Sequence, residues 1–483
     1  MKPIHPPPPL SRRAFLGTCC SAVTATGLLS QLAQLRLIGA VAATDSQANA
    51  GSTTAAQLDP GHKALVCLFL AGGNDSNNMV VPTDVTRYQE YAKGRGALGL
   101  PREALLPVSY RSPTGQTYGL HPAMPEVRSM FDRGSAAIVA NVGTLLHPTT
   151  RVQYTNRTVP LPPGLYGHNS GQVDWQSSLP DRGFHTGWGG RVADLTQSLN
   201  GNNRVSMSLS VAGQNFFQVG RNVSQYSVNL NGGLNLGEWG PPGSTAGLRT
   251  SALDDIINLQ NQNLFETAYA GIMRGAIDDG LYLSSFLKGP SPYSSFFSSL
   301  NSSLSQQLHM ICRLVALQQP LGLRRQVFFA QVNGWDLHDS QLSIDSPVSG
   351  AHANLLRDVS RSVDAFYSAL GSIGAGNQVT TFTASDFGRT LGTNGDGSDH
   401  AWGSHHLVMG GAVRGAQVYG KMPEFQLGGP DDAGDRGLWI PTISVDEYSA
   451  TLAKWFGVSA TDLPIALPNI GRFSQPDLGF MKS

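Results

Sequence analysis

Charged side chains are scarce in this chain of 483 residues. Lys, Arg, Asp and Glu together account for 14% of it, where an ordinary soluble protein has about a quarter. The 33 basic and 33 acidic residues give a formal net charge of zero, and Lys and Arg form no cluster along the sequence. Because nucleic acids are bound by basic surfaces, we expect no nucleic-acid partner.

Cysteine is also rare, with four in the whole chain. Cys19 and Cys20 lie near the N-terminus, and the sequence has no CxxC pair with metal-ligand spacing. Cys67 falls in a continuous apolar run and Cys312 in an amphipathic stretch, which predicts two thiols in the core. A disulfide between these two cysteines is the alternative.

Long apolar runs are missing as well, and no stretch after the N-terminal region could span a bilayer. The N-terminal region carries a twin-arginine pattern at 11–16, then small and apolar residues, and an Ala-x-Ala motif at 40–42. Arg36 interrupts the apolar run, so an export signal is favoured over a membrane anchor. We therefore predict a signal peptide at 1–43 and a linker at 44–60, with twin-arginine export to the periplasm or secretion.

In the rest of the chain, 61–483, stretches typical of strands alternate with stretches typical of helices. We predict this region to be a single α/β domain. Apolar runs at 63–70, 136–142 and 325–332 and a short β-rich run at 379–383 indicate buried strands. Apolar residues at helical spacing occupy 250–287, 304–317, 352–370 and 445–456. Strands and helices in alternation predict a doubly wound, mostly parallel sheet flanked by helices. The Asn/Gly/Ser-rich stretch at 200–247 is predicted to be a loop-rich insertion or lid.

Acidic and histidine side chains follow three of these strands. They are Asp75 after the first strand, Asp336 and His338 after the strand at 325–332, and Asp386, Asp399, His400 and His405 after the strand at 379–383. Parallel strands present their carboxyl ends at one edge of a sheet, so we expect these side chains to meet there.

Carboxylates and imidazoles together are the ligands of divalent metals. These seven residues therefore predict a site for one or two ions, with zinc, manganese or calcium as candidates. Two ions about 4 Å apart can hold the attacking and leaving oxygens of a phosphate or sulfate ester. Arg389 would supply a planar fork for an oxyanion, and Ser76 is the candidate nucleophile, with Thr149, Thr150 and Ser170 as rivals.

Each of these residues also has a structural alternative, because Asp and His in Gly-rich loops often cap helices and fix turns. His168 is a further case. It is either a ligand, a substrate contact or, as a lone histidine near a tryptophan more often is, a structural residue beside Trp175.

Several longer motifs resemble one bacterial family. In order they are GGNDS at 72–76, LHPAM at 120–124, GWGGR at 187–191, GWDLH at 334–338, SDFGRT at 385–390, DHAWG at 399–403 and the tail at 441–456. With the twin-arginine start, the chain resembles over nearly its whole length the exported, largely uncharacterised family called domain of unknown function 1501. Members of that family look like the alkaline phosphatase and sulfatase superfamily in fold.

This resemblance implies an alkaline-phosphatase-like α/β core whose sheet edge holds two metals, through a first-strand Asp and later Asp/His pairs. Two departures stand out. The family often has Ser-His-Ser-Asp-Gln where this chain has GHNSGQ at 167–172, so a hydroxyl nucleophile there would be lost. Phe387 stands where the second member of an Asp-His metal pair is expected, which leaves Asp399 with His400 as the pair, or a one-metal site.

We therefore expect an exported, metal-dependent hydrolase of phosphate or sulfate esters that acts on a small molecule or a glycan ester. The alternative is a non-catalytic exported protein that keeps the fold and binds a glycan, an envelope component or a partner protein. The Asn/Gly/Ser-rich stretch and the altered serine loop favour the binding protein, whereas the density of Asp and His favours the enzyme.

Overall fold

The computed structural model describes residues 58–183, 185–201, 203–230, 232, 243–259, 263–343 and 345–482. The predicted signal peptide and most of the predicted linker lie outside these residues. The chain divides into two compact units. One comprises 1–50 and 236–278, and its described part contains the helix α9 (Thr245–Ile257) and the first part of α10 (Leu264–Phe286), joined by an ion pair of 2.9 Å between Arg274 and Asp254.

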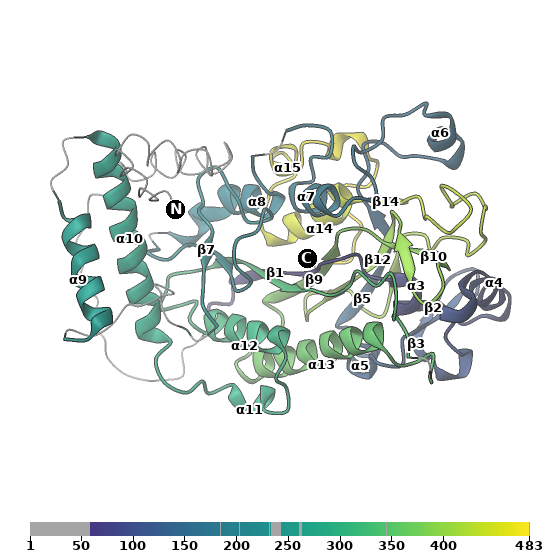
Figure 1. Ribbon diagram of the computed structural model, residues 1–483, viewed down its shortest axis with the longest axis horizontal. Coiled ribbons are helices and arrows are strands. Elements are labelled where there is room, and N and C mark those ends of the chain that lie inside the picture. Colours follow the sequence, from purple (N-terminus) through teal and green to yellow (C-terminus); the bar gives the residue numbers. More distant parts are fainter. Residues whose placement is uncertain are drawn as a thin grey trace, which may run out of the picture. The chain divides into compact units, whose positions relative to one another are not determined.

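The other unit, 51–235 and 279–483, is built on a nine-stranded sheet in the part of the chain that the structure describes (Figure 1). The strand order is β13-β5-β12-β9-β1-β8-β6-β7, and β14 also pairs with β5. The strands are β1 (Lys63–Leu70), β5 (Ala136–Gly143), β6 (Ser208–Ser210), β7 (Tyr226–Ser227), β8 (Arg325–Val332), β9 (Val379–Ser385), β12 (Ser404–Met409), β13 (Val418–Tyr419) and β14 (Ile443–Ser444).

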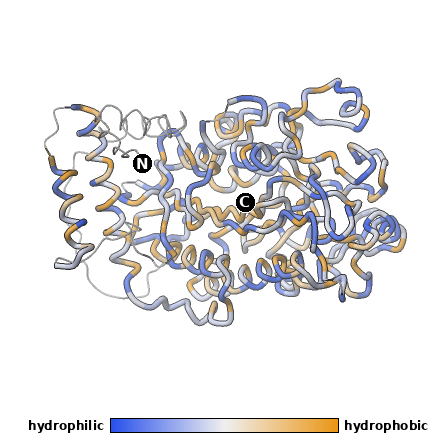
Figure 2. The backbone as a smooth tube through the Cα atoms, viewed as in Figure 1, coloured by the Kyte–Doolittle hydropathy of each residue, from blue (hydrophilic) through white to orange (hydrophobic). Residues whose placement is uncertain are grey.

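The centre of this sheet is parallel. β1 lies between β8 and β9, with Leu70 opposite both Val332 and Ser385. β12 is antiparallel to its two neighbours, β5 and β9, whereas the other described pairs in the sheet are parallel. Apolar residues run along the central strands (Figure 2) and are almost completely buried, because helices cover both faces.

Helices pack on the two faces of the sheet (Figure 1). One face is covered by α5 (Pro125–Asp132), α12 (Ser303–Ala316) and α13 (Ala351–Ser372), and the other by α7 (His168–Ser177), α8 (Trp188–Thr196) and α14 (Val445–Phe456). Side-chain caps fix where several of them begin. The hydroxyl of Ser302 accepts from the backbone N–H of Ser305 at the start of α12, and Ser444 forms a capping box with Glu447 at the start of α14.

Shorter elements lie around the main sheet and its helical layers (Figure 1). A three-stranded sheet has the order β2-β4-β3, and β10 pairs with β11. These elements are α3 (Ser76–Met79), β2 (Val80–Pro82), α4 (Val85–Arg95), β3 (Leu106–Arg111), β4 (Thr117–Leu120), α6 (Arg151–Asn156), α11 (Ser294–Phe297), β10 (Arg389–Thr393), β11 (Ser398–His400) and α15 (Leu463–Ala466).

The predicted fold class, a mostly parallel α/β sheet between two helical layers, is confirmed. The strands predicted at 63–70 and 325–332 have the observed bounds of β1 and β8. The stretch predicted to be helical at 250–287 contains two helices, α9 and α10. Within the stretch at 200–247, which is expected to hold short β-like pieces, β6 and β7 extend the main sheet beyond β8.

Cys67 and Cys312 are free and buried, as predicted. Burial raises the pKa of both thiols, to about 12 for Cys312, so both remain protonated. Of the helices within the described residues, none combines the length and apolar character that a bilayer span needs.

Candidate metal centre

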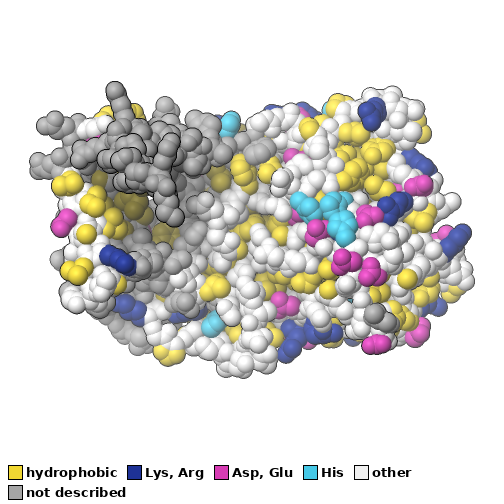
Figure 3. All heavy atoms as spheres, viewed as in Figure 1, with side chains coloured by type: hydrophobic (Ala, Val, Ile, Leu, Met, Phe, Trp, Pro, Cys, Tyr) yellow, Lys and Arg dark blue, Asp and Glu magenta, His cyan; other side chains and the backbone are white. Residues whose placement is uncertain are grey.

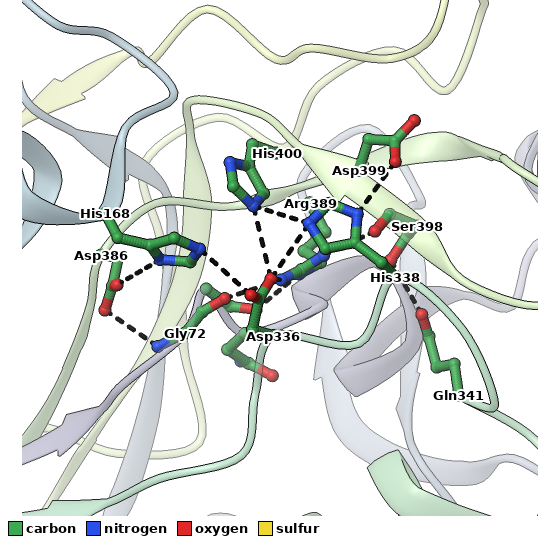
Figure 4. Close-up of polar contacts among 12 residues, drawn as sticks. Gly72, His168, Asp336, His338, Gln341, Asp386, Arg389, Ser398, Asp399 and His400 are labelled. Carbon is green, nitrogen blue, oxygen red and sulfur yellow. Dashed lines mark hydrogen bonds and ion pairs between the residues drawn. The ribbon is translucent and has the colours of Figure 1, made fainter.

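The carboxyl ends of β1, β8 and β9 lie side by side, and the loops that leave them bring titratable side chains together (Figure 4). The loop after β8 carries Asp336 and His338. His400 ends β11, in the hairpin that follows β9, and His168 begins α7. We call His168, Asp336, His338 and His400 the candidate centre. On the space-filling surface, histidine side chains gather on one face beside acidic ones (Figure 3).

Short distances join the four members of the candidate centre. Asp336 Oδ1 lies 3.1 Å from His338 Nε2 and 3.3 Å from His400 Nε2, and Asp336 Oδ2 lies 3.3 Å from His168 Nε2. The Nε2 atoms of His338 and His400 are 2.8 Å apart. One ligand atom each from His168, Asp336 and His400 fits within 4.8 Å, close enough to hold one ion, whereas His338 is not part of this group of three and adjoins it through Asp336 and His400.

The outer nitrogens of the three histidines have acceptors as partners. Nδ1 lies 2.8 Å from Asp386 Oδ2 in His168, 3.1 Å from Asp399 Oδ1 in His338, and 2.7 Å from the Tyr166 carbonyl oxygen in His400. In a neutral imidazole these partners favour the tautomer with the proton on Nδ1. In that tautomer each Nε2 turns a lone pair toward Asp336, and the buried Nε2 of His168 forms no hydrogen bond, although it lies 3.3 Å from Asp336 Oδ2.

Charge keeps the candidate centre ready to bind a cation. Burial alone would raise the pKa of Asp336, but the hydrogen bond and charge of Arg389, with those of the neighbouring histidines, lower this pKa overall. Burial also lowers the pKa of His400, and the charge of Arg389 adds to this effect. The carboxylate is therefore ionised and His400 is neutral near pH 7, which is the protonation state of metal ligands.

Arg389 does not offer an open fork to a substrate. It is buried, and its guanidinium donates to the carbonyl oxygens of Gly73 at 3.0 Å, Gly72 at 2.7 Å and Ser398 at 2.5 Å, and also to Asp336. These bonds use most of its N–H groups. The predicted oxyanion role is corrected by this geometry, and Arg389 instead holds Asp336 in place against the turn after β1.

Asp386 and Asp399 contact the centre's histidines from outside. The Asp386 side chain is fully buried and accepts from the Gly72 N–H at 3.0 Å and Gln172 Nε2 at 2.9 Å, besides facing His168. Asp399 pairs with Arg436 at 2.6 Å and accepts from Asn394. Both carboxylates are thus partners of a histidine ring rather than members of the converging set.

The structure does not bring Asp75 or Ser76 to the candidate centre. Asp75 is buried, where it forms an ion pair with Arg95 and accepts from Gln341 Nε2 at 2.5 Å. Ser76 is the first residue of α3 and is 1% exposed. A buried carboxylate needs such a partner, which explains why Asp75 faces Arg95 and not the edge of the sheet.

His405 and the rival hydroxyls have other roles as well. His405 lies on β12, where its Nδ1 accepts from the Asn141 N–H at 3.0 Å, and burial lowers its pKa to about 3. Thr150 caps α6, Thr149 donates to the His147 carbonyl oxygen at 2.8 Å, and Ser170 donates to the Gly167 carbonyl oxygen at 3.0 Å. These contacts give each residue a structural function in its own loop or strand.

Phe387 fills the space beside the candidate centre. Its ring centroid lies 4.9 Å from that of His168 and 4.4 Å from that of His400. An apolar ring in this position supplies no ligand for a second ion. Together with the placement of Asp75 and His405, it favours a single ion over the two that the family resemblance implies.

Sequence reasoning left His168 among the structural alternatives and did not select it as a ligand. Its partner Asp386 is 218 positions away in the chain, so no local pattern connects the two. A local signal for His168 is its place directly after Gly167 at the start of a helix.

The donor set fits a borderline transition metal. Two imidazole nitrogens and one carboxylate, with the imidazole of His338 beside them, suit zinc, manganese or iron, whereas calcium prefers oxygen ligands. The buried Nε2 of His168, which has no hydrogen-bond partner, is the observation that a bound cation would explain.

The fold and this set of side chains define an α/β protein with a His/Asp site at the carboxyl edge of a parallel sheet core. Residues 316–433 match the family described as "Protein of unknown function (DUF1501)", so the resemblance predicted from the motifs is confirmed over that segment. The segment contains Asp336, His338 and His400 but not His168. No curated protein sequence matches the chain.

Three solved structures show low similarity. The PsFucS1 sulfatase from Pseudoalteromonas sp. has a TM-score of 0.35 and 11% identity, covering 95% of this chain and 78% of its own. Ps i-CgsB in complex with k-i-k-neocarrahexaose has a TM-score of 0.34 and 11% identity, covering 86% and 77%. A variant of the alkaline phosphatase PafA has a TM-score of 0.26 and 12% identity, covering 69% and 64%. No residue role is carried over at these levels.

Proposed function

We propose that this chain is an exported, metal-dependent hydrolase of phosphate or sulfate esters, and that His168, Asp336, His338 and His400 hold one divalent ion. The supporting observation is the convergence of three imidazole nitrogens, each with its lone pair inward, on one carboxylate. Arg389 offsets the charge of Asp336, and a bound cation would in addition offset the repulsion between the inward Nε2 lone pairs and this carboxylate. Zinc or manganese is the ion expected from these ligands.

A divalent ion in such a site supplies a Lewis acid and lowers the pKa of a water ligand toward neutrality. The chain's own residues prepare the site. Asp386, Asp399 and the Tyr166 carbonyl set the histidine tautomers, which is the usual task of groups behind metal ligands. Arg389 holds the carboxylate of Asp336, and the ring of Phe387 shields the site on one side.

The ester substrate is the expectation of the family resemblance, and the geometry is compatible with it. The side chains of Asp336 and His338 are 45% and 44% exposed, so a substrate can reach them from solvent. Ser76 is buried in α3, so we assign the attack on the ester to water. Water then adds to the phosphorus or sulfur atom, and the alcohol leaves with a proton.

The alternative function, a non-catalytic exported protein that binds a glycan or a partner, has one specific observation in its favour. The two residues predicted to act on a substrate are unavailable, because Arg389 is already bonded within the protein and Ser76 is buried. The experiment below separates the two functions.

Metal analysis and turnover test the proposal together. The folded protein is expected to carry about one zinc or manganese ion per chain, the stoichiometry of a single tetrahedral site, and to hydrolyse 4-nitrophenyl phosphate or sulfate. His168→Ala and Asp336→Asn should lose both properties. His185→Ala, which removes an exposed histidine, should keep both. Bound metal without turnover on either ester would leave the binding protein as the function, and a metal-free wild type would exclude the centre itself.

A further inference from the structure

A polar groove lies on the helical layer formed by α12 and α13. It has a volume of about 550 Å³ and is formed by the loop before α12 and the first half of α13. Seven of its lining residues are polar or charged: Ser299, Asn301, Ser302, Asn354, Arg357, Asp358 and Arg361. Leu300 and Leu355 add two apolar side chains. We call it the α12–α13 groove.

Arg357 and Arg361 are its cationic groups. They lie one helical turn apart on α13, both are exposed, and among the ion pairs of the described residues neither has an acidic partner. Arg357 Nη1 donates to Asn354 Oδ1 at 2.7 Å, and Arg361 Nη2 contacts Ser299 Oγ at 3.5 Å. Most of their N–H groups therefore face solvent and are available to an anion.

Asp358, the acidic residue in the lining of the groove, does not neutralise both arginines. Asp358 accepts from the hydroxyl of Ser362 at 3.0 Å, within the same helix. Two arginines against one aspartate leave the groove with one net positive charge. Basic side chains are visible over α13 on the same face as the histidine group (Figure 3).

The chain connects the groove directly to the candidate centre. Gly334 lines the groove and stands two positions before Asp336. Two residues of chain span at most about 7 Å, so the end of the groove lined by Gly334 lies close to Asp336.

We propose that the α12–α13 groove is a subsite for an anionic oligosaccharide. The two arginines would bind a sulfate, phosphate or carboxylate group on a sugar ring, since a planar guanidinium matches these oxyanions. The asparagine amides and serine hydroxyls would pair with ring hydroxyls, and the leucines would contact an apolar ring face. A role of the groove in binding a substrate rests on the proposed function. Binding of an anionic sugar to the groove does not depend on that function.

Calorimetric titration of the full chain with three tetrasaccharides tests this proposal: one sulfated, one made of uronic acids and one neutral. The sulfated or the uronic sugar should bind, and the neutral sugar should bind much more weakly. Arg357→Gln and Arg361→Gln should each weaken binding by about tenfold or more, the effect of losing a charge-assisted hydrogen bond. Arg111→Gln, a matched change at another exposed arginine, should not.

The outcomes separate this proposal from the proposed function. The two arginine variants should keep their metal and hydrolyse small aryl esters at the wild-type rate. Arginine-dependent binding without any ester turnover would support the groove and refute the hydrolase. Equal binding of the neutral and anionic sugars, or binding unchanged in the Arg357→Gln/Arg361→Gln double variant, would overturn the groove and leave the hydrolase standing. Preference between the sulfated and uronic sugars identifies the anionic group.

Discussion

Asp386 and Asp399 show how a carboxylate can matter to a metal centre without being a ligand. Each accepts from Nδ1 of one histidine and so turns the Nε2 lone pair inward. Asp386 is the more constrained of the two, because a backbone N–H and the amide of Gln172 also donate to it. An Asn at this position would place an amide N–H against at least one of these donors.

Asp386→Asn should therefore weaken metal binding by about 10- to 100-fold, the range for loss of a group that orients a ligand. Titration of the metal-free protein with zinc measures this affinity. Asp339→Asn is the matched control, because it removes the same charge from an exposed residue next to His338. Equal affinities of the two variants and the wild type would show that Asp386 has no orienting role.

At the residue scale, site residues could be predicted from the sequence where they directly follow a buried strand. Asp336 and His338 come within six positions after an apolar run, and that proximity places them at the sheet edge. Asp75 has the same local pattern, yet it is turned away by Arg95, a contact that no spacing rule reveals. His168 belongs to the centre only through a partner from a distant strand.

At the scale of elements, the centre depends on the close approach of two loops. Gly72, in the turn after β1, has φ +121°, and an added Cβ would collide with the backbone nitrogen of Asp336. The N–H of Gly72 also donates to Asp386, and its carbonyl accepts from Arg389. This glycine therefore sets how near the β8 loop can come to the turn after β1.

Gly72→Ala should destabilise the fold by at least about 2 kcal/mol, from backbone strain plus the steric clash, and should lower metal content. Gly115→Ala is the control for strain alone, because Gly115 has φ +82° and open space around it. It should cost about 1 kcal/mol and leave the metal bound. Urea unfolding and metal analysis of both variants provide the comparison, and equal losses would exclude a packing role for Gly72.

The elements themselves were predictable to different degrees. Buried parallel strands such as β1 and β8 have mostly apolar runs, so their bounds follow from the sequence. β6 and β7 are only three and two residues long, in a polar stretch, and their place in the sheet comes from pairing with β8. Such pairing is a long-range property that no local composition reports.

At the scale of the whole molecule, the core contains an unusual set of neutral histidines. Burial lowers the pKa of all five from the ordinary value of 6.5: to about 4 in His62 and His121, to about 3 in His405 and His406, and well below 6.5 in His352. The unfolded chain would take up protons below pH 6.5 at these positions, whereas the folded chain would not. Acid therefore favours unfolding.

Two buried aspartates act in the opposite direction. Burial raises the pKa of Asp174 and Asp446 to about 7. Between pH 7 and 5 the folded chain takes up protons there, while the unfolded chain, with an aspartate pKa near 4, does not. Each aspartate adds about 2 kcal/mol of stability over this interval, and each buried histidine removes about 2 kcal/mol. With five histidines against two aspartates, the loss exceeds the gain.

The free energy of unfolding should thus be lower at pH 5 than at pH 7. Urea unfolding of the Asp336→Asn variant at both pH values measures this difference without a contribution from metal release. His121→Asn should reduce the difference by about 2 kcal/mol, because its amide oxygen can still accept from the Ala123 N–H but takes up no proton. His185→Asn, at an exposed position, should leave the difference unchanged. Equal or greater stability at pH 5 would mean that the buried histidines are protonated within the folded chain.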